Sequence, residues 1–335
     1  MTLADSQKLI KMAIAKETTP GTAETTPDSY VYLTNTPQIK VNRNFEMLKP
    51  ASHRDVVLST ANGYTTSLTA EVWGMPVSVI GHMMAGAFGS CSAAQQGGTI
   101  AYKHTFSLAD TLNSYTIWHK TGISETKSTY NQVNKLTINS PQNKVVNFSA
   151  DFVGGRVVTT TDFGAASYSS VNPFKSQMGS LTFGQAGATV RTNMTDFQMV
   201  IDNGINIDEG IVHGQRYPNT VIAGDRKVTG SLTFWMPDND EGQRFWEGVD
   251  TDPSATEPAE TPGLVTLTSV KWTGPTISGA YNYELEFAMD NMQLTAFDYE
   301  FGGNRIAGKA EFQAVVGTGS NLLLGYLTNT RTTAY

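Results

Sequence analysis

The stretch Ser67-Leu-Thr-Ala-Glu-Val-Trp-Gly-Met-Pro76 decides the fold, because a close copy of it, Ser231-Leu-Thr-Phe-Trp-Met-Pro237, stands later in the chain. Both copies begin with the alternation of apolar and polar residues that is typical of a strand with one buried face. Both then turn at a Met-Pro pair, where proline cannot continue a strand ladder. The copies are 164 residues apart at Ser67 and Ser231 and 161 residues apart at the two prolines. The pair predicts that one fold occurs twice in this chain of 335 residues.

Two further pairs of segments follow in the same order. Asn134-Lys-Leu-Thr-Ile-Asn139 is similar to Asn291-Met-Gln-Leu-Thr-Ala296, and segment 143–154 is similar to segment 304–317. Period-two alternation predicts strands over 64–72, 148–152, 196–201, 227–234 and 281–290. Strands with one apolar and one polar face belong to antiparallel sheets. We therefore expect a mainly β protein made of two tandem β-sandwiches, each with one flanking helix.

Few helices are expected. Residues 6–16 fit a short amphipathic helix, since Leu9, Ile10, Ala13 and Ile14 share a face. A helix over 77–88 follows Pro76, and Asp238 with Glu241 has the spacing of a capping box at the start of a helix that reaches Trp246. Glycine-, serine- and threonine-rich stretches predict loops over 89–99 and 252–263, an extended arm over 16–28, and a linker over 157–179.

Composition excludes several classes of protein. The formal net charge is −7, and only 16% of the residues are charged. This acidic balance disfavours a nucleic-acid-binding face, because phosphate affinity depends on lysine and arginine. Cys91 is the single cysteine, so no intrachain disulfide and no cysteine zinc site is expected. No apolar run approaches the ~20 residues of a membrane span.

No catalytic pattern stands out, so we expect no enzyme, no metal and no cofactor. The sequence has no Gly-x-Ser-x-Gly elbow, no His-Glu-x-x-His and no phosphate-binding loop motif. Glu284 and Glu286 are expected about 7 Å apart on one strand face, so they point the same way rather than across a cleft. The five histidines show no ligand spacing.

Two long connections carry apolar residues among charges, which is typical of contact surfaces. They lie between Asn42 and Asn62 and between Asn203 and Asp225. We expect these loops to contact further copies of the chain. The candidate residues are Phe45, Met47, Leu48, Val56, Val57, Ile205, Ile207, Ile211, Val212 and Tyr217.

Three short motifs, in this order, resemble a known family. They are Lys16-Glu-Thr-Thr-Pro-Gly21-Thr, Phe197-Gln-Met-Val-Ile-Asp-Asn203-Gly and Val228-Thr-Gly-Ser-Leu-Thr233. The chain is similar to the tail tube (major tail) proteins of long-tailed bacteriophages in their duplicated form. The first half departs from the pattern, with Thr66 where the second half has Gly230.

The resemblance implies the following organisation of the chain. An N-terminal helix and arm (1–28) precede a first tube-like β-sandwich (29–156), a linker (157–179), a second such sandwich (180–327) and a C-terminal tail (328–335). The arm is expected to add contacts between copies, so that removing residues 1–28 would leave a folded protein that polymerises poorly. One sheet of every domain would contribute to a ring-shaped β-barrel.

The resemblance also implies a function. The chain would be a structural virion protein, assembled in the host cytoplasm as trimeric, pseudo-hexameric rings that stack into a tail tube for genome delivery. Partners would be further copies and other tail proteins such as tape measure, terminator and tip, and DNA would pass without specific binding. Glu284, Glu286 and Asp290 are the candidates for lining the lumen.

Other readings stay open at this point. The chain could be another tail component, such as a tail-end, neck or fibre protein, which would stop at one ring. A carbohydrate-binding or adhesion β-sandwich would need an exposed aromatic platform, and an enzyme would need a cleft with perturbed acids.

Overall fold

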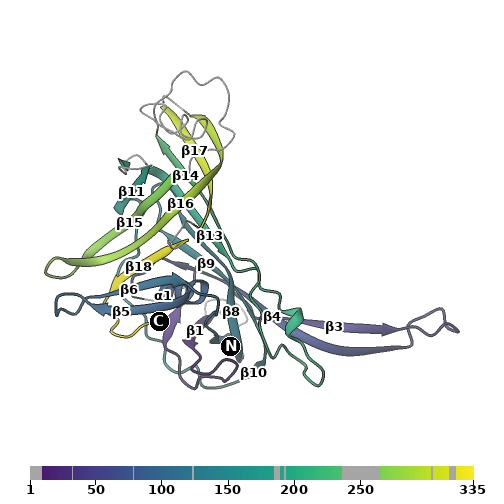
Figure 1. Cartoon of the computed structure of the whole chain (residues 1–335). Helices are drawn as coiled ribbons and strands as arrows, with labels where there is room; N and C mark the ends of the chain where they lie inside the picture. The colour runs from purple at the N-terminus through teal and green to yellow at the C-terminus, as the bar shows by residue number, and fades with distance from the viewer. Residues whose placement is uncertain are drawn as a thin grey trace.

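The computed structural model describes residues 10–31, 33–77, 79–122, 124–184, 189–191, 194–235, 265–302, 305–316 and 322–335. Figure 1 shows a β-rich body from which one long hairpin projects. The first half contains β1 (Lys11–Lys16), β2 (Ser29–Val31), β3 (Lys40–Leu48), β4 (Leu58–Trp73), α1 (Ile80–Phe88), β5 (Gly89–Gln95), β6 (Tyr102–Leu108), β7 (Tyr115–Lys120), β8 (Glu125–Ser140), β9 (Asn147–Gly154) and β10 (Val157–Thr159). The second half contains η3 (Ser176–Met178), β11 (Gly179–Gly184), β12 (Thr189–Arg191), β13 (Met194–Asp202), η4 (Asp208–Gly210), β14 (Lys227–Trp235), β15 (Val265–Ser278), β16 (Tyr281–Gly302), β17 (Arg305–Ala314) and β18 (Leu324–Asn329).

Eight strands form one antiparallel sheet in the order β3-β4-β9-β8-β13-β14-β17-β16, which we call the eight-stranded sheet. The first four strands and the last four follow the same plan: two successive strands that pair (β3-β4 and β13-β14), then two later strands in reverse order (β9-β8 and β17-β16). The halves meet where β8 pairs with β13, with Leu136 opposite Ile201. The two copies expected from the sequence therefore share one strand order and one continuous sheet.

The remaining strands repeat the plan in a second layer. The first part of β8 pairs with β7, which pairs with β1, and the first part of β16 pairs with β15, which pairs with β11. β10 runs along β8, as β18 runs along β16. β18 also pairs with β6, so the last strand of the second half joins the β5-β6 hairpin of the first half.

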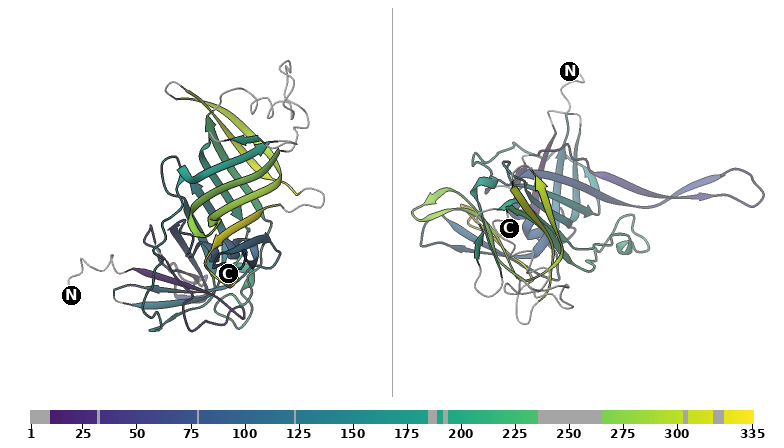
Figure 2. Two further views of the ribbon diagram at one scale, coloured as in Figure 1. Left: turned by 90° about the vertical axis from the view of Figure 1, so that its left-hand side faces the viewer. Right: turned by 90° about the horizontal axis from the view of Figure 1, so that it is seen from above.

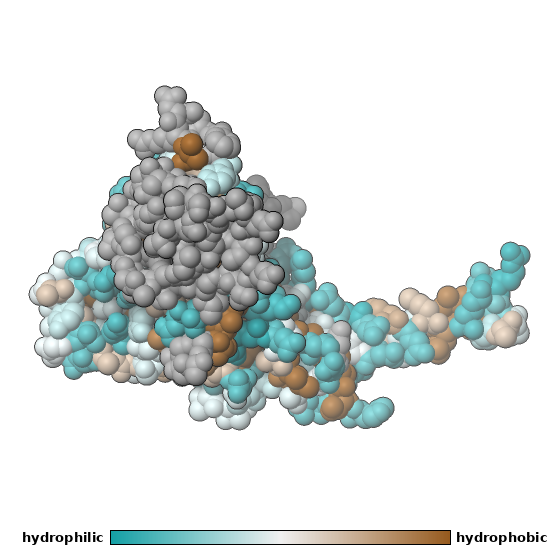
Figure 3. Space-filling view, turned by 45° about the horizontal axis from the view of Figure 1, so that its top comes forward, coloured by the Kyte–Doolittle hydropathy of each residue, from teal (hydrophilic) through white to brown (hydrophobic). Residues whose placement is uncertain are grey.

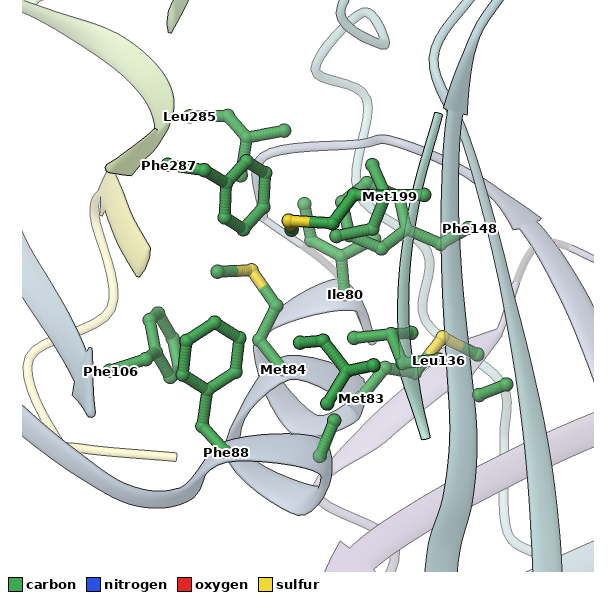
Figure 4. Packing of buried hydrophobic residues seen from close by; sticks show 14 of the residues in the cluster. Ile80, Met83, Met84, Phe88, Phe106, Leu136, Phe148, Met199, Leu285 and Phe287 are labelled. Carbon is green, nitrogen blue, oxygen red and sulfur yellow. The ribbon is translucent and has the colours of Figure 1, made fainter. Parts of the chain in front are cut away.

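The core is shared by both halves, and α1 lies in the middle of it. All nine residues of α1 are buried. Figure 4 shows its side chains between Leu136, Phe148 and Met199 on one side and Leu285 and Phe287 on the other. The helix is short and has His82 as its one polar side chain, because it is enclosed by sheet rather than laid on a surface. The expected helix over 77–88 is thus confirmed from Ile80 onward.

The helix expected over 6–16 is wrong for the described residues, because Lys11–Lys16 forms strand β1. Met12 and Ile14 face the main core, whereas Ala13 and Ala15 face a smaller cluster around Trp118. A strand buried on both faces has an unbroken apolar run, and periodicity does not distinguish such a run from a buried helix. The N-terminal arm is accordingly anchored in the fold by β1, so removing residues 1–28 would delete part of the core, and the expectation that this deletion leaves a folded protein is replaced by one of lost stability.

Two expected loops are also strands. Gly89–Gln95 forms β5 rather than part of a loop over 89–99, since its small residues pair along β6. The connection between Asn42 and Asn62 is mostly ladder, because β3 extends to Leu48 and β4 starts at Leu58. The helix expected after Asp238 and the loop expected over 252–263 lie outside the described residues.

Candidate assembly surfaces

One face of the eight-stranded sheet is mainly polar, with Trp73 as an exposed apolar exception, and we call it the polar face. The apolar residues of β4, β9, β13, β14 and β17 point into the core, so the alternating Ser, Thr, Asn, Gln and charged residues point the other way. Its described charged side chains comprise seven carboxylates and four lysines. They are Glu46, Glu71, Asp151, Asp196, Asp202, Asp298 and Glu311, and Lys40, Lys135, Lys227 and Lys309.

Three of the four lysines of the polar face stand opposite carboxylates, and the fourth, Lys40, stands opposite Ser67. Asp202 stands opposite Lys227 on one neighbouring strand and opposite Lys135 on the other. Lys309 stands opposite Asp298, and its Nζ lies 3.2 Å from a carboxylate oxygen of Glu311. Cross-strand pairs of opposite charge stabilise a sheet modestly. Their further effect is that the charges of these three lysines are balanced locally, so the face offers little net attraction to phosphates.

The eight-stranded sheet ends in two open edges. Among the described strands, β3 pairs with β4 alone, and residues 294–302 of β16 pair with β17 alone. Val41 on β3 and Tyr299 on β16 occupy the core-facing side at these two edges, yet they are 41% and 40% exposed. Unpaired edges with apolar side chains promote pairing with another chain.

The hairpin of β3 and β4 forms an arm that extends away from the body (Figure 2, right). Five of the expected contact residues gather on it, at the end of β3 and just before β4, and Leu58 joins them. All six are exposed: Phe45, Met47, Leu48, Val56, Val57 and Leu58. Figure 3 shows this apolar surface as brown patches on the arm among hydrophilic residues. Exposed apolar clusters of this kind mark interaction surfaces.

The second expected contact loop, between Asn203 and Asp225, packs against the base of the arm instead of projecting into solvent. The backbone N–H of Tyr64 donates to the carbonyl of Arg216 at 2.9 Å, and the rings of Tyr64 and Tyr217 lie 6.1 Å apart. Of the expected residues in this loop, Val212 is exposed. Ile205, Ile207, Ile211 and Tyr217 are half-buried.

Glu284, Glu286 and Asp290 lie on the first part of β16, which pairs with β15 and β18, and not on the polar face. Lys271 Nζ lies 2.8 Å from Glu284 Oε1, and the Ser269 hydroxyl donates to Glu286 at 2.7 Å. The strand β16 changes sheets near Met292, and nothing in its sequence marks that change. The polar-face residues were recognisable as strand residues, but only the pairing shows that their strands form one surface.

A polar cluster beside α1 joins the buried His82 to the partly exposed Asp28 and Arg331. His82 Nε2 lies 2.9 Å from Asp28 Oδ2, and Arg331 Nη2 lies 2.8 Å from the same oxygen. Burial lowers the pKa of His82, against the opposing effect of Asp28. Burial would raise the pKa of Asp28, but His82 and Arg331 hold that pKa well below its usual range. The ring of Tyr335 packs on His82 at 5.1 Å, so this cluster fixes the end of the chain.

The described residues contain no group of three His, Cys, Asp or Glu side chains placed to hold a metal ion. Within the same part of the chain, every helix is too short or too polar to cross a bilayer.

Comparison with models of known protein families gives a match. The family model for phage tail tube proteins matches residues 8–311 of the 335. The chain matched no curated protein.

Proposed function

This chain belongs to the phage tail tube protein family, and on that premise we propose that it polymerises as stacked trimeric rings into the tube through which a phage genome is delivered. As a member of the family it is a structural tail protein. The observation that supports ring formation is the eight-stranded sheet, which has an open edge at each end and the same four-strand plan twice.

Three copies suit this sheet. Strands about 4.8 Å apart that tilt by about 40° give a barrel of 24 strands a backbone diameter of about 48 Å. Side chains on the inner wall reduce that diameter by about 10 Å, and the bore that remains has room for a DNA duplex. A ring of two copies would leave a bore only roughly 20 Å wide. Because each copy contributes two four-strand units, a trimer has pseudo-sixfold symmetry.

The polar face lines the bore in this arrangement, because the opposite face of the sheet is buried in the core. Its balanced lysines and excess of carboxylates let DNA pass without specific binding, since each unbalanced lysine would add salt-dependent phosphate affinity. The placement of Glu284, Glu286 and Asp290 on a different sheet makes them outer-layer residues in the same arrangement.

The arm supplies the contact between rings. Its apolar end projects beyond the body, and a second copy in the adjacent ring would bury it. The assembled tube belongs to the virion tail and is built in the host cytoplasm, with other tail proteins such as tape measure, terminator and tip at its core and ends. The protein has no catalytic role in this assembly.

Negative-stain electron microscopy of the purified protein tests the proposal. Wild-type protein is expected to form long cylinders. Met47→Asp combined with Val57→Asp changes two side chains that are 60% and 57% exposed, so the fold should persist and assembly should stop at single rings. Glu284→Lys is the matched control away from the arm and should still form cylinders.

Strictly monomeric wild-type protein would refute ring formation. Wild-type protein that stops at one ring would instead favour an adaptor at the neck or tail end. Cylinders of normal length from the arm variant would refute the role of the arm.

A further inference from the structure

The pairing of β8 with β13 inside the chain provides a template for the contact between copies. We infer that β3 of one copy pairs antiparallel with residues 297–302 of β16 in the next copy, with Arg43 opposite Tyr299 and Asn44 opposite Asp298. This inference rests on the proposed ring assembly. It adds the register of the strand pairing between neighbouring copies, a contact that we call the seam.

The register follows from equivalent positions in the two halves. Ser67 and Ser231 are equivalent in the repeat, so Tyr64 corresponds to Val228. Tyr64 stands opposite Arg43, and Val228 stands opposite Ile201. Arg43 is therefore the first-half counterpart of Ile201.

The other side of the seam is found in the same way. Ala70 stands opposite Ala150, and its counterpart Phe234 stands opposite Gly308. Across the next ladder, Ala150 stands opposite Leu136, and Gly308 stands opposite Tyr299. By its place in the ladders, Tyr299 is therefore the second-half counterpart of Leu136, although the similar segments 134–139 and 291–296 align Leu136 with Leu294 in sequence. Inside the chain Ile201 stands opposite Leu136, so the same plan between copies places Arg43 opposite Tyr299.

The polar face gives a second pair by the same steps. Asn44 corresponds to Asp202, since their partners Gly63 and Lys227 are equivalent. Asp298 corresponds to Lys135, since their partners Lys309 and Asp151 are equivalent. Asp202 stands opposite Lys135 within the chain, so Asn44 stands opposite Asp298 between copies.

The chemistry of both edges fits this register. Arg43 would lie against the Tyr299 ring, which is 40% exposed and packs on Phe297 at 5.2 Å. Arginine over an aromatic face is a favourable pair. On the polar face, the Asn44 amide has N–H groups to donate to the Asp298 carboxylate. Val41, two residues before Arg43, would continue the apolar side across the seam.

Cysteine cross-linking tests the register. Residues directly opposite in an antiparallel pair have Cα atoms about 4.5–5.5 Å apart, within the range of a disulfide. In a Cys91→Ser background, Asn44→Cys with Asp298→Cys is expected to give covalent dimers and trimers on a non-reducing gel after mild oxidation of assembled protein. A ladder that ends at three chains supports closure by three copies.

Two control pairs use the same background. Asn42→Cys with Asp298→Cys lies on the same face but two residues out of register, at about 8 Å between Cα atoms, and should give at least tenfold less product. Asp202→Cys with Lys135→Cys is the internal counterpart and should form a disulfide within one chain, without a dimer band.

The outcomes separate the inference from the proposed function. Normal tubes with an oxidised internal pair but no seam product would overturn the register and leave tube assembly standing. Stronger product from the out-of-register pair would overturn it as well. Protein that neither cross-links nor forms rings would refute the proposed function itself.

Discussion

Gly81 on α1 allows Tyr335 to pack against the helix, and Gly81→Ala is expected to expel that ring. An alanine Cβ at this position would lie 2.1–2.4 Å from three atoms of the ring, which is far inside van der Waals contact. The ring has no room to shift, because His82, His104 and Phe106 surround it at centroid distances of 5.1, 4.9 and 6.2 Å.

Two opposing effects set the magnitude. Alanine favours a helix over glycine by at most about 1 kcal/mol. Tyr335 is 2% exposed, and burying an aromatic ring of 150–250 Å² stabilises by about 4–6 kcal/mol at 25 cal/mol per Å². Partial repacking recovers some of that burial, so we expect Gly81→Ala to lower the free energy of unfolding by about 2–4 kcal/mol.

A double-mutant cycle checks the cause. With Tyr335→Ala the ring is absent, so Gly81→Ala should then be neutral or stabilising by up to about 1 kcal/mol. Urea unfolding followed by the fluorescence of the buried Trp118 and Trp272 measures all four proteins at one fixed protein concentration. If Gly81→Ala destabilises both backgrounds equally, or leaves the wild-type protein unaffected, the steric reasoning is wrong.

Three further predictions follow from the described contacts. Burial lowers the pKa of His104 below its unfolded value of about 6.5, so the unfolded chain binds the proton more readily than the folded protein does. The free energy of unfolding is therefore retained above about pH 6.5 and falls as the pH drops below it, by at most about 1.4 kcal/mol per pH unit, and His104→Gln should reduce this slope between pH 7 and 5. Glu71→Lys combined with Glu311→Lys on the polar face should make assembled tubes retain duplex DNA at 50 mM salt and release it at 200 mM. Glu284→Lys combined with Glu286→Lys changes the charge equally on another sheet and should not cause retention. Equal retention of DNA by both double variants would contradict the assignment of the polar face to the bore. Deleting residues 1–16 removes the four buried residues of β1 and should abolish cooperative thermal unfolding, measured by calorimetry; wild-type cooperativity in that deletion would show that β1 is dispensable.

The sequence predicts the alternating strands well because a strand with one buried face has a local signature. Segments such as 196–201 and 281–290 form β13 and part of β16 as expected, with the apolar residues inward. The helix over 80–88 and the two similar Met-Pro corners are local signals of the same kind. The strand β1 was missed because burial on both faces removes the alternation.

The candidate bore residues show what local sequence patterns do not predict, namely the sheet to which each part of a strand belongs. Glu284 and Asp298 belong to one strand, and both alternate with apolar neighbours, yet they lie on different sheets because β16 pairs with β15 and β18 first and with β17 afterwards. The arm likewise has the apolar residues expected of a contact surface, but its length comes from a ladder that the proline and charged residues in 42–62 did not indicate.

By itself, the sequence determined that this protein is mainly β, duplicated and free of recognisable catalytic motifs, because alternation, repetition and residue chemistry are properties of nearby positions. The tertiary structure decided that the two halves share one sheet, which face of that sheet is mainly polar, and which edges stay open. Those features depend on hydrogen bonds between strands far apart in the chain, and the residues of a strand do not identify the strand with which it pairs.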